Sequence, residues 1–453
     1  MTPSRLQRPL ALWRAKIAAL ARSGAVSVEA PIESDNSGGT NLASHCRAAY
    51  KFGALIEASM STRTRVPLPH VLDMVERGAA DALFNAPFGL FARQKIRAMI
   101  GRKLIMAESA LDASQLQPAS LDLRISKEAY RLRASFLPGR GRTVRDRLRS
   151  LNAEPLSLAG KGAVLEKGIV YVARLMERLE LRPNLSGAAN PKSSTGRLDI
   201  FTRLIVDGAE AFDEVPLGYS GELWLEISPR SFSVRVRAGT RLNQIRFRSR
   251  HAQQKEKYSF NLSDAEIRGQ HQKCPLVDGQ LDLREGVVLH VDLRGSSEDV
   301  VGYRAIKNSD VIDVNKVRGY AIEDYWEPIH ARPDRRLILD PDEFYILASR
   351  EKVQVPADLA AEMAPIDPAI GEFRVHYAGF FDPGFGQGPE GSPTSRAVLE
   401  VRSRDVPFLL EDGQPVGRLV YEKLASPADE LYGQSPASHY QHQGLKLSKH
   451  FRE

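Results

Sequence analysis

The chain repeats itself at a fixed distance, and this repeat constrains its fold more than any other feature. Residues 165–172 align without a gap on residues 339–346, an offset of 174 positions. The same offset places residues 225–227, Leu-Glu-Ile, on residues 399–401, Leu-Glu-Val. Two separate blocks that share one offset indicate a tandem duplication of one structural unit. A chain of 453 residues is long enough for each copy to bury its own core.

Short strands are the expected building blocks of each copy. Alternating apolar and polar residues, with Gly and Pro turns between them, predict strands in the first copy at 120–126, 169–175, 199–206, 222–227, 232–237 and 242–247. Helical spacing predicts one helix over 91–101. Closely spaced short strands predict a mainly β protein of two tandem β-barrel or jelly-roll domains with a few short helices.

The expected domain boundaries follow from changes in composition. Residues 25–70 are rich in Ser, Gly, Thr and Asn and show little periodicity. We therefore expect residues 1–87 to be a flexible N-terminal extension, either an appendage or translated sequence upstream of the true start. The polar stretch 249–280 separates the copies. It places the first domain at 88–275 and the second at 276–453.

The net charge of +7 comes largely from two segments, residues 1–28 and 131–150. The second holds seven arginines against one acid, without aromatic residues in a stacking pattern, so solvated basic faces are favoured over a nucleic-acid partner. No apolar run is long enough to cross a membrane. Two cysteines, Cys46 and Cys274, indicate a reducing compartment. We expect a cytoplasmic protein with no membrane partner.

Residues 190–197, Asn-Pro-Lys-Ser-Ser-Thr-Gly-Arg, have the composition of an anion-binding loop. Lys192 and Arg197 supply charged donors, and Ser193 and Ser194 supply hydroxyls between them. The proline and the glycine predict a backbone that is neither regular helix nor strand. On residue types alone, a plain surface loop is the alternative.

A carboxylate stands in the middle of the strand predicted at 222–227. Leu223, Leu225 and Ile227 fall on one face of this strand, and Trp224 and Glu226 fall on the other. Such a glutamate is either a solvated residue on the outer face or an acid/base group with a tuned pKa. The pattern alone leaves both readings open.

Residues 190–197 and 218–226, together with 116–126, resemble three motifs of the dCTP deaminase family, a branch of the trimeric dUTPase-like fold. The motifs follow one another in the family's order. Residues 431–448 resemble the tail that closes over the nucleotide in these enzymes. Within the tail, His439 stands where the family often has a lysine.

The resemblance implies hydrolytic deamination of dCTP to dUTP and ammonia, which supplies dUTP for thymidylate synthesis. It implies that Glu226 transfers protons, that Ser193 holds the water and that Arg197 orients the site. The implied substrate-binding residues are Lys192, Ser194, Tyr432, His439 and Gln443. Since the family's sites lie between subunits, it also implies a homo-oligomer around a threefold axis.

Metal ligands of the zinc deaminases are missing from the sequence. Those enzymes need a Pro-Cys-x-x-Cys pair, and no Cys-x-x-Cys occurs in this chain. The expectation is therefore deamination without zinc and without a metal held by protein ligands. Mg²⁺ is expected only as a companion of the triphosphate, because its phosphate oxygens suit this hard cation.

The two copies have diverged at the motif positions. At the common offset, Ser193 and Ser194 fall on an aspartate and a proline at 367–368, which cannot offer the same donors. The first copy is thus expected to be catalytic, and the second to support it with the closing tail. The second copy keeps an Asp-Pro-Gly turn beginning at Asp382, similar to a family motif.

Two other functions stay open from the sequence. A dUTP diphosphatase needs an aspartate just before the tyrosine of its motif, but residues 215–222 read Val-Pro-Leu-Gly-Tyr-Ser-Gly-Glu. Asp382 leaves a bifunctional deaminase and diphosphatase possible. A non-catalytic nucleotide-sensing protein that kept the fold is the alternative outside enzymes.

Overall fold

The computed structural model describes residues 88–250, 259–365, 374–375, 379–403, 405–434 and 438–452. The extension expected at 1–87 lies outside these residues, so its flexibility stays a prediction. No helix among the described residues is both long and apolar enough to span a membrane.

The first copy is built on a ten-stranded sheet that curves around a core. Its main path runs β8 (Ile200–Val206), β10 (Ser220–Pro229), β6 (Val170–Glu180), β3 (Leu121–Leu132), β12 (Arg241–Ser249), β7 (Leu185–Pro191) and β9 (Glu214–Val215). Added to it are β1 (Gly89–Leu90), β2 (Ile105–Ala107) and β4 (Glu154–Ser157). The helical elements of this copy are α4 (Arg93–Gly101), η1 (Ala113–Gln115), α5 (Val144–Ser150) and α6 (Ser193–Gly196).

The second copy divides its strands among smaller sheets. One sheet holds β13 (Val287–His290), β24 (Pro415–Lys423), β19 (Leu359–Pro365) and β21 (Phe380–Phe381). Another holds β16 (Trp326–His330), β14 (Val300–Ala305), β18 (Tyr345–Val353), β22 (Ser395–Arg402) and β20 (Arg374–Val375). A two-stranded sheet pairs β17 (Arg336–Leu339) with β23 (Phe408–Glu411). Its helical elements are α7 (Asp264–Lys273) and η3 (Pro389–Gly391).

The tandem duplication is confirmed by the strand registers. Strands β7 and β19 have the same length and lie 174 positions apart. In the first copy Leu225 pairs with Ala173, and in the second Leu399 pairs with Leu347, the same register at the same offset. The mainly β, duplicated fold expected from the sequence is therefore confirmed, and so is the helix expected over 91–101.

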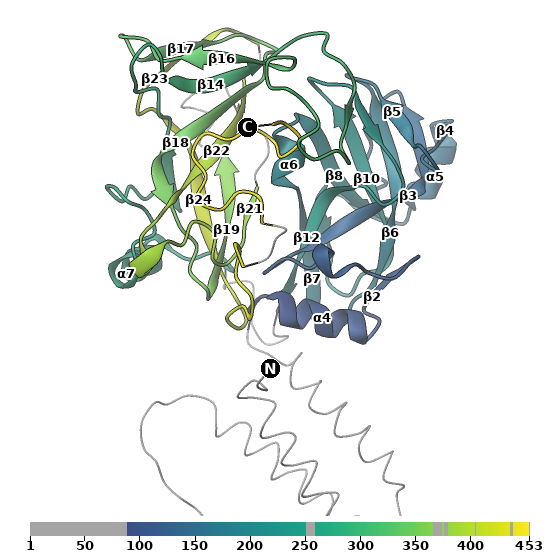
Figure 1. The fold of residues 1–453 in the computed structure, drawn as a ribbon. Coiled ribbons are helices and arrows are strands. Elements are labelled where there is room, and N and C mark those ends of the chain that lie inside the picture. The colour runs from purple at the N-terminus through teal and green to yellow at the C-terminus, as the bar shows by residue number, and fades with distance from the viewer. Residues whose placement is uncertain are drawn as a thin grey trace, which may run out of the picture. The chain divides into compact units, whose positions relative to one another are not determined.

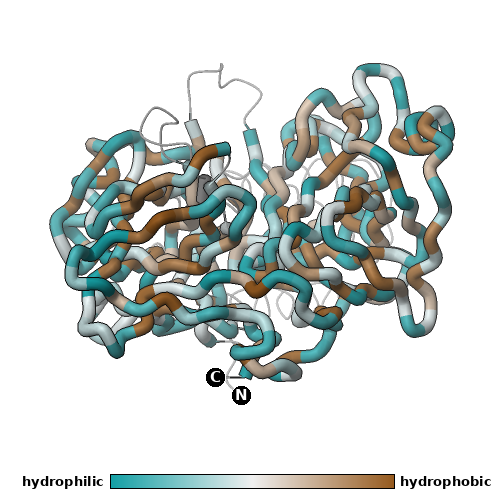
Figure 2. Tube along the Cα trace, turned by 90° about the horizontal axis from the view of Figure 1, so that it is seen from above, coloured by the Kyte–Doolittle hydropathy of each residue, from teal (hydrophilic) through white to brown (hydrophobic). Residues whose placement is uncertain are grey.

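The described residues form two large buried cores, and Figure 2 shows hydrophobic strands in two lobes lying side by side. The first core is built mainly from the first copy but also takes in residues of the second, such as Trp326 and Phe344. In β10, Leu223, Leu225 and Ile227 all enter the first core, as the alternation predicted. Leu262 and Ile267 belong to the second core. The chain has therefore entered the second lobe before residue 262, earlier than the boundary expected at 275.

The two copies also exchange contacts. Strand β15 (Ile312–Asp313), from the second copy, runs parallel to β11 (Val234–Val236) of the first, which pairs on its other side with β5 (Ala163–Leu165). Arg402 of the second copy donates from Nε to Asp199 Oδ2 of the first at 3.1 Å, with both residues buried. Phe232 of the first copy also packs edge-on against Trp326 of the second. The copies therefore meet over a buried interface that has both polar and apolar contacts.

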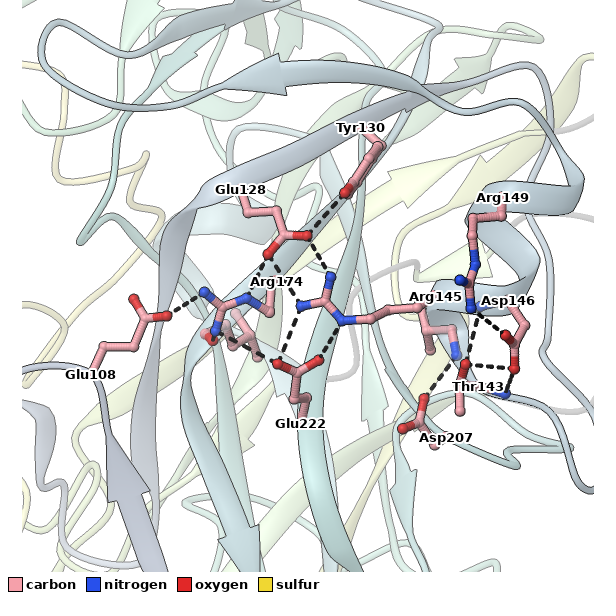
Figure 3. Close-up of polar contacts among 12 residues, drawn as sticks. Glu108, Glu128, Tyr130, Thr143, Arg145, Asp146, Arg149, Arg174, Asp207 and Glu222 are labelled. Carbon is pink, nitrogen blue, oxygen red and sulfur yellow. Dashed lines mark hydrogen bonds and ion pairs between the residues drawn. The ribbon is translucent and has the colours of Figure 1, made fainter.

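The basic segment 131–150 is fastened to the outer face of the first copy. Arg145 lies between Glu128 and Glu222, at 2.8 and 3.0 Å, and stacks over the ring of Trp224. Arg174 bonds the same Glu128 at 2.8 Å, which completes the network drawn in Figure 3. Part of the positive charge seen in the sequence is thus neutralised by sheet carboxylates beside a small apolar cluster.

Candidate active site

A cavity of about 370 Å³ opens between the two copies, and its walls come from three parts of the chain. The first copy contributes among others Asp122, Lys192, Ser193, Ser194, Arg197, Arg241 and Gln244. The second copy contributes among others Phe380, Phe381, Asp382, Phe385 and Glu400. The C-terminal tail, yellow beside α6 in Figure 1, contributes Tyr432, His439, Tyr440, Gln443 and Lys449.

The Lys-Ser-Ser segment forms one helical turn, α6, rather than the irregular loop predicted from its proline and glycine. Pro191 closes β7, and the turn begins two residues later, so the proline does not interrupt it. Lys192 caps the turn and forms an ion pair with Asp122 on β3. Its ammonium group therefore stays at the cavity wall.

Arg197 joins this turn to the C-terminal tail. Its guanidinium donates to the carbonyl of Lys446 and to Gln443 Oε1, both at 2.9 Å. It also stacks on the ring of Tyr440, 3.9 Å from the ring centre. Gln443 in turn donates to the carbonyl of Arg396 in the second copy at 2.9 Å. The predicted residues Arg197 and Gln443 thus meet in one buried contact.

Glu400, at the middle of β22, is the buried carboxyl group that the second copy brings to the cavity. Its side chain is 5% exposed, and it is a wall residue together with Ser193 and Arg197. Burial raises the pKa of Glu400 to about 8, although the charge of Arg197 acts in the opposite direction. A carboxyl group with such a pKa exchanges a proton near neutral pH.

Glu226, predicted from the family resemblance as the proton-transfer residue, is not among the cavity walls. It is 1% exposed on β10 and accepts from Arg203 Nη2 at 2.6 Å and Arg203 Nε at 2.9 Å. Arg203 stacks on Phe212, 3.6 Å from the ring centre. The structure therefore brings Ser193 and Arg197 together with Glu400, the tandem equivalent of Glu226, and not with Glu226 itself.

The other predicted substrate-binding residues lie together at the cavity. Lys192, Ser194, Tyr432, His439 and Gln443 are all wall residues. Burial and then the charges of Lys449 and Lys192 lower the pKa of His439 to about 4, so its imidazole is neutral at pH 7. His439 can offer a hydrogen bond to a phosphate but not the positive charge of the lysine often found there in the family.

The cavity residues that the sequence analysis missed as site residues include three charged ones, Asp122, Arg241 and Lys449. Burial, followed by the charge of Lys192, lowers the pKa of Lys449 to about 8. The leucines on either side of Asp122 in the sequence give no sign that it faces Lys192, 70 positions away. The pairing becomes visible only once β3 and β7 are both placed beside β12.

The cavity offers two kinds of chemistry. Its walls include the carboxyl group of Glu400, the serine Ser193 and the guanidinium of Arg197, a set that suits acid/base catalysis. The basic side chains of Lys192, Arg241 and Lys449 suit an anionic group. Among the described residues, no group of three or more His, Cys, Asp and Glu side chains is placed to hold a metal ion.

Two family models match the two copies separately. The model for the N-terminal domain of 2′-deoxycytidine 5′-triphosphate deaminase matches residues 87–251, and the model for the C-terminal domain matches residues 263–451. Together they span both lobes of the structure and the tail.

Individual relatives point to the same enzyme. The crystal structure of 2′-deoxycytidine 5′-triphosphate deaminase from Agrobacterium tumefaciens is 52% identical, covers 74% of this chain and 99% of that chain, and superposes with a TM-score of 0.69. A dUMP-forming dCTP deaminase of Halobacterium salinarum is 29% identical over 189 residues, 40% of this chain and 90% of the relative. Another, from Methanothermobacter thermautotrophicus, is 32% identical over 147 residues, 32% of this chain and 68% of the relative.

Proposed function

This chain belongs to the dCTP deaminase family, and from that membership we propose which of its residues remove the amino group of dCTP. The protein is an enzyme that hydrolyses dCTP at the amino-bearing carbon of the base. The observation that carries our assignment is that Glu400, Ser193 and Arg197 all line the same cavity.

Deamination requires water to attack C4 of cytosine, a proton to leave that water, and protons to reach N3 and the departing amino group. The C4–N bond breaks as the C4–O bond becomes a carbonyl, and ammonia leaves. The carboxylate of Glu400 takes one proton from the attacking water and delivers it to N3. It then takes the second proton from the new C4 hydroxyl and delivers it to the amino group, which leaves as ammonia. The raised pKa of Glu400 suits both directions of transfer.

Ser193 and Arg197 support this shuttle from the other copy. Ser193 lines the cavity, and a serine hydroxyl can both donate to and accept from an attacking water. Arg197 holds the tail through Gln443 and Tyr440, so it shapes the site as well as its charge. Its positive charge favours the ionised form of Glu400, the form that accepts the proton.

The triphosphate is assigned to the basic part of the cavity. Lys192, Arg241 and Lys449 provide charge, and Ser194, Tyr432, His439 and Gln443 provide neutral hydrogen-bonding groups. Charged hydrogen bonds of this kind contribute roughly 1.5–3 kcal/mol each. The affinity of the enzyme for its substrate is therefore expected to fall strongly when the phosphates are removed from the nucleotide.

Mg²⁺ is expected to accompany the triphosphate. Asp122 Oδ1 is buried at the cavity without a hydrogen-bond partner among the described residues, while Lys192 pairs with the other oxygen. Mg²⁺ prefers phosphate oxygens, water and one or two carboxylates, so Asp122 fits its surroundings. Bound there, Mg²⁺ would neutralise phosphate charge. The absence of zinc chemistry remains a prediction.

The interface between subunits that the family resemblance implies has a counterpart inside this chain. Groups from both copies line the cavity, and the tail of the second copy docks on α6 through Ser448, which donates to the carbonyl of Ser194 at 2.9 Å. One chain therefore supplies both halves of a site. Further assembly around a threefold axis remains a proposal.

The test is ammonia release from dCTP with Mg²⁺, with and without a zinc chelator. We expect turnover that survives the chelator and dUTP as the first product. Nucleotide binding with neither ammonia nor pyrophosphate would support the nucleotide-sensing alternative instead.

A second activity, release of dUMP and pyrophosphate, is the runner-up. The names of several relatives say that they form dUMP, and Asp382 places a further carboxyl group at the cavity. Pyrophosphate measured in the same assay decides between the products. Pyrophosphate from added dUTP, lost in Asp382→Asn, would establish the bifunctional enzyme.

The pH profile of kcat/KM tests the charge states of the free enzyme. Below pH 8 we expect kcat/KM to rise about tenfold per pH unit as Glu400 ionises. Above pH 8 it should fall as Lys449 loses its proton. His439 and His450, whose pKa values burial lowers to about 4, do not titrate in this range.

Lys449→Arg is the matched variant for this profile, because its guanidinium stays charged. It should remove the fall above pH 8 and keep the rise below it. A profile that is flat between pH 6 and 8 would contradict the assignment of Glu400.

A further inference from the structure

We propose that Arg246, a residue of the first copy outside the cavity, is a positioning residue that fixes the nucleotide-contacting wall formed by Phe380, Phe381 and Asp382 of the second copy. The inference rests on the proposed function of the cavity. It adds a residue that connects the packing of the two copies to substrate affinity.

Arg246 is fully buried and binds the second copy at several atoms. Nη1 donates to the carbonyl of Ala361 at 3.0 Å, and Nη2 donates to the carbonyl of Phe381 at 3.0 Å. Nη2 also lies 3.3 Å from Asp382 Oδ1, and the guanidinium stacks on Phe380, 4.0 Å from the ring centre. One planar group thus contacts three consecutive residues of the wall.

The position of Arg246 on β12 explains why it acts behind the wall. Gln244, Arg246 and Arg248 share one face of the strand, while Ile245 and Phe247 enter the first core. Gln244 lines the cavity, but neither arginine does. Arg246 and Arg248 therefore lie on the same strand face as Gln244 but outside the cavity.

The two copies carry different side chains at the equivalent positions, so only the first copy can donate this guanidinium to the second. At the tandem offset, Arg246 corresponds to Val420 and Arg248 to Glu422. Glu422 forms ion pairs with both arginines, at 3.3 Å with Arg246 Nη1. A buried guanidinium needs such compensation, and Glu422 on β24 supplies it to the arginines of β12.

Arg246 links this wall to the first copy, so we expect the geometry of the wall to depend on its guanidinium. Strand β21 holds only Phe380 and Phe381, and its ladder pairs with Ala361 and Glu362 alone. Ala361 is also an acceptor of Arg246. Without the arginine, Asp382 and two carbonyls would lose their buried donor, and the wall would shift toward another arrangement.

The experiment compares steady-state kinetics of wild type, Arg246→Met, Arg246→Lys and Arg248→Met. Arg248→Met is the matched control, since it removes a charge from the same strand face and from the same Glu422 but touches no wall residue. We expect Arg246→Met to raise KM for dCTP about 30-fold while kcat changes less than about fivefold, because the wall contacts substrate but not the reacting carboxyl. Arg246→Lys should raise KM about fivefold, since an ammonium cannot hold all these acceptors.

Comparing the change in KM with the change in kcat separates a positioning role of Arg246 from an effect on folding stability. A variant that merely folds poorly lowers kcat through a smaller active fraction and leaves KM unchanged. Arg248→Met is expected to keep KM within about twofold. An unchanged KM in Arg246→Met, or an equal rise in Arg248→Met, would overturn the proposal. If Arg246→Met does not fold, an unchanged KM in Arg246→Lys overturns it. Absence of ammonia release from wild type would instead overturn the proposed function.

Discussion

Replacing Glu400 by glutamine is expected to lower kcat for dCTP deamination by about 10³-fold, within the range of general acid/base catalysis. The amide keeps the size of the side chain but can neither take the proton of the attacking water nor return it. Since glutamine is neutral, it suits a site in which burial already disfavours the charged form. The variant should therefore fold normally and still bind dCTP, which isothermal titration and ammonia release together would show.

Glu226→Gln is the matched control. Glu226 occupies the equivalent position of the other copy and is equally buried, but it pairs with Arg203 outside the cavity. We expect it to keep kcat within about threefold, although stability falls because Arg203 loses a charged partner. The opposite result, an inactive Glu226→Gln beside an active Glu400→Gln, would return the catalytic role to Glu226.

Arg197→Met is expected to lower kcat/KM by about 100-fold. The substitution removes the two hydrogen bonds to Lys446 and Gln443 and the stacking on Tyr440, so the tail closes less tightly over the nucleotide. It also removes the positive charge that lowers the pKa of Glu400. The pKa of Glu400 should then rise further above its ordinary value, and the rise of kcat/KM with pH should move to higher pH.

The control for this variant is Arg203→Met. Arg203 also lies beside a buried glutamate and stacks on an aromatic ring, but at Glu226. Its loss should leave both kcat/KM and the pH profile of deamination unchanged. A shift of the profile in Arg203→Met, or none in Arg197→Met, would refute the electrostatic role assigned to Arg197.

Local patterns were sufficient to predict most of the fold. The alternation in β10 sends Leu223, Leu225 and Ile227 to the core. The repeated blocks predicted two copies, and the structure gives these copies equal strand registers. These features depend on neighbouring residues, so a sequence carries them directly. The single turn α6 was missed because one turn has too few residues for a helical period.

The candidate site could be predicted only in part. The sequence named Ser193, Arg197 and the tail residue Gln443, which meet at the cavity. It assigned the carboxyl group to Glu226, although Glu400 stands at the equivalent position of the equivalent strand in the other copy. Only the packing of the copies determines which carboxyl faces α6. Arg246 was hidden for the same reason, because its partners lie on strands more than 100 positions away.

The division of one cavity between two copies of a single polypeptide has a consequence for how this enzyme can change. In an assembly of identical subunits, each substitution appears on both sides of every interface at once. Here, a codon change alters Arg197 without altering residue 371, or Glu400 without altering Glu226. Each half is therefore free to specialise, one as the loop that holds the substrate and the other as the source of the carboxylate. The arginine-rich β12 opposite the acidic Glu422 of β24 is such a specialised pair.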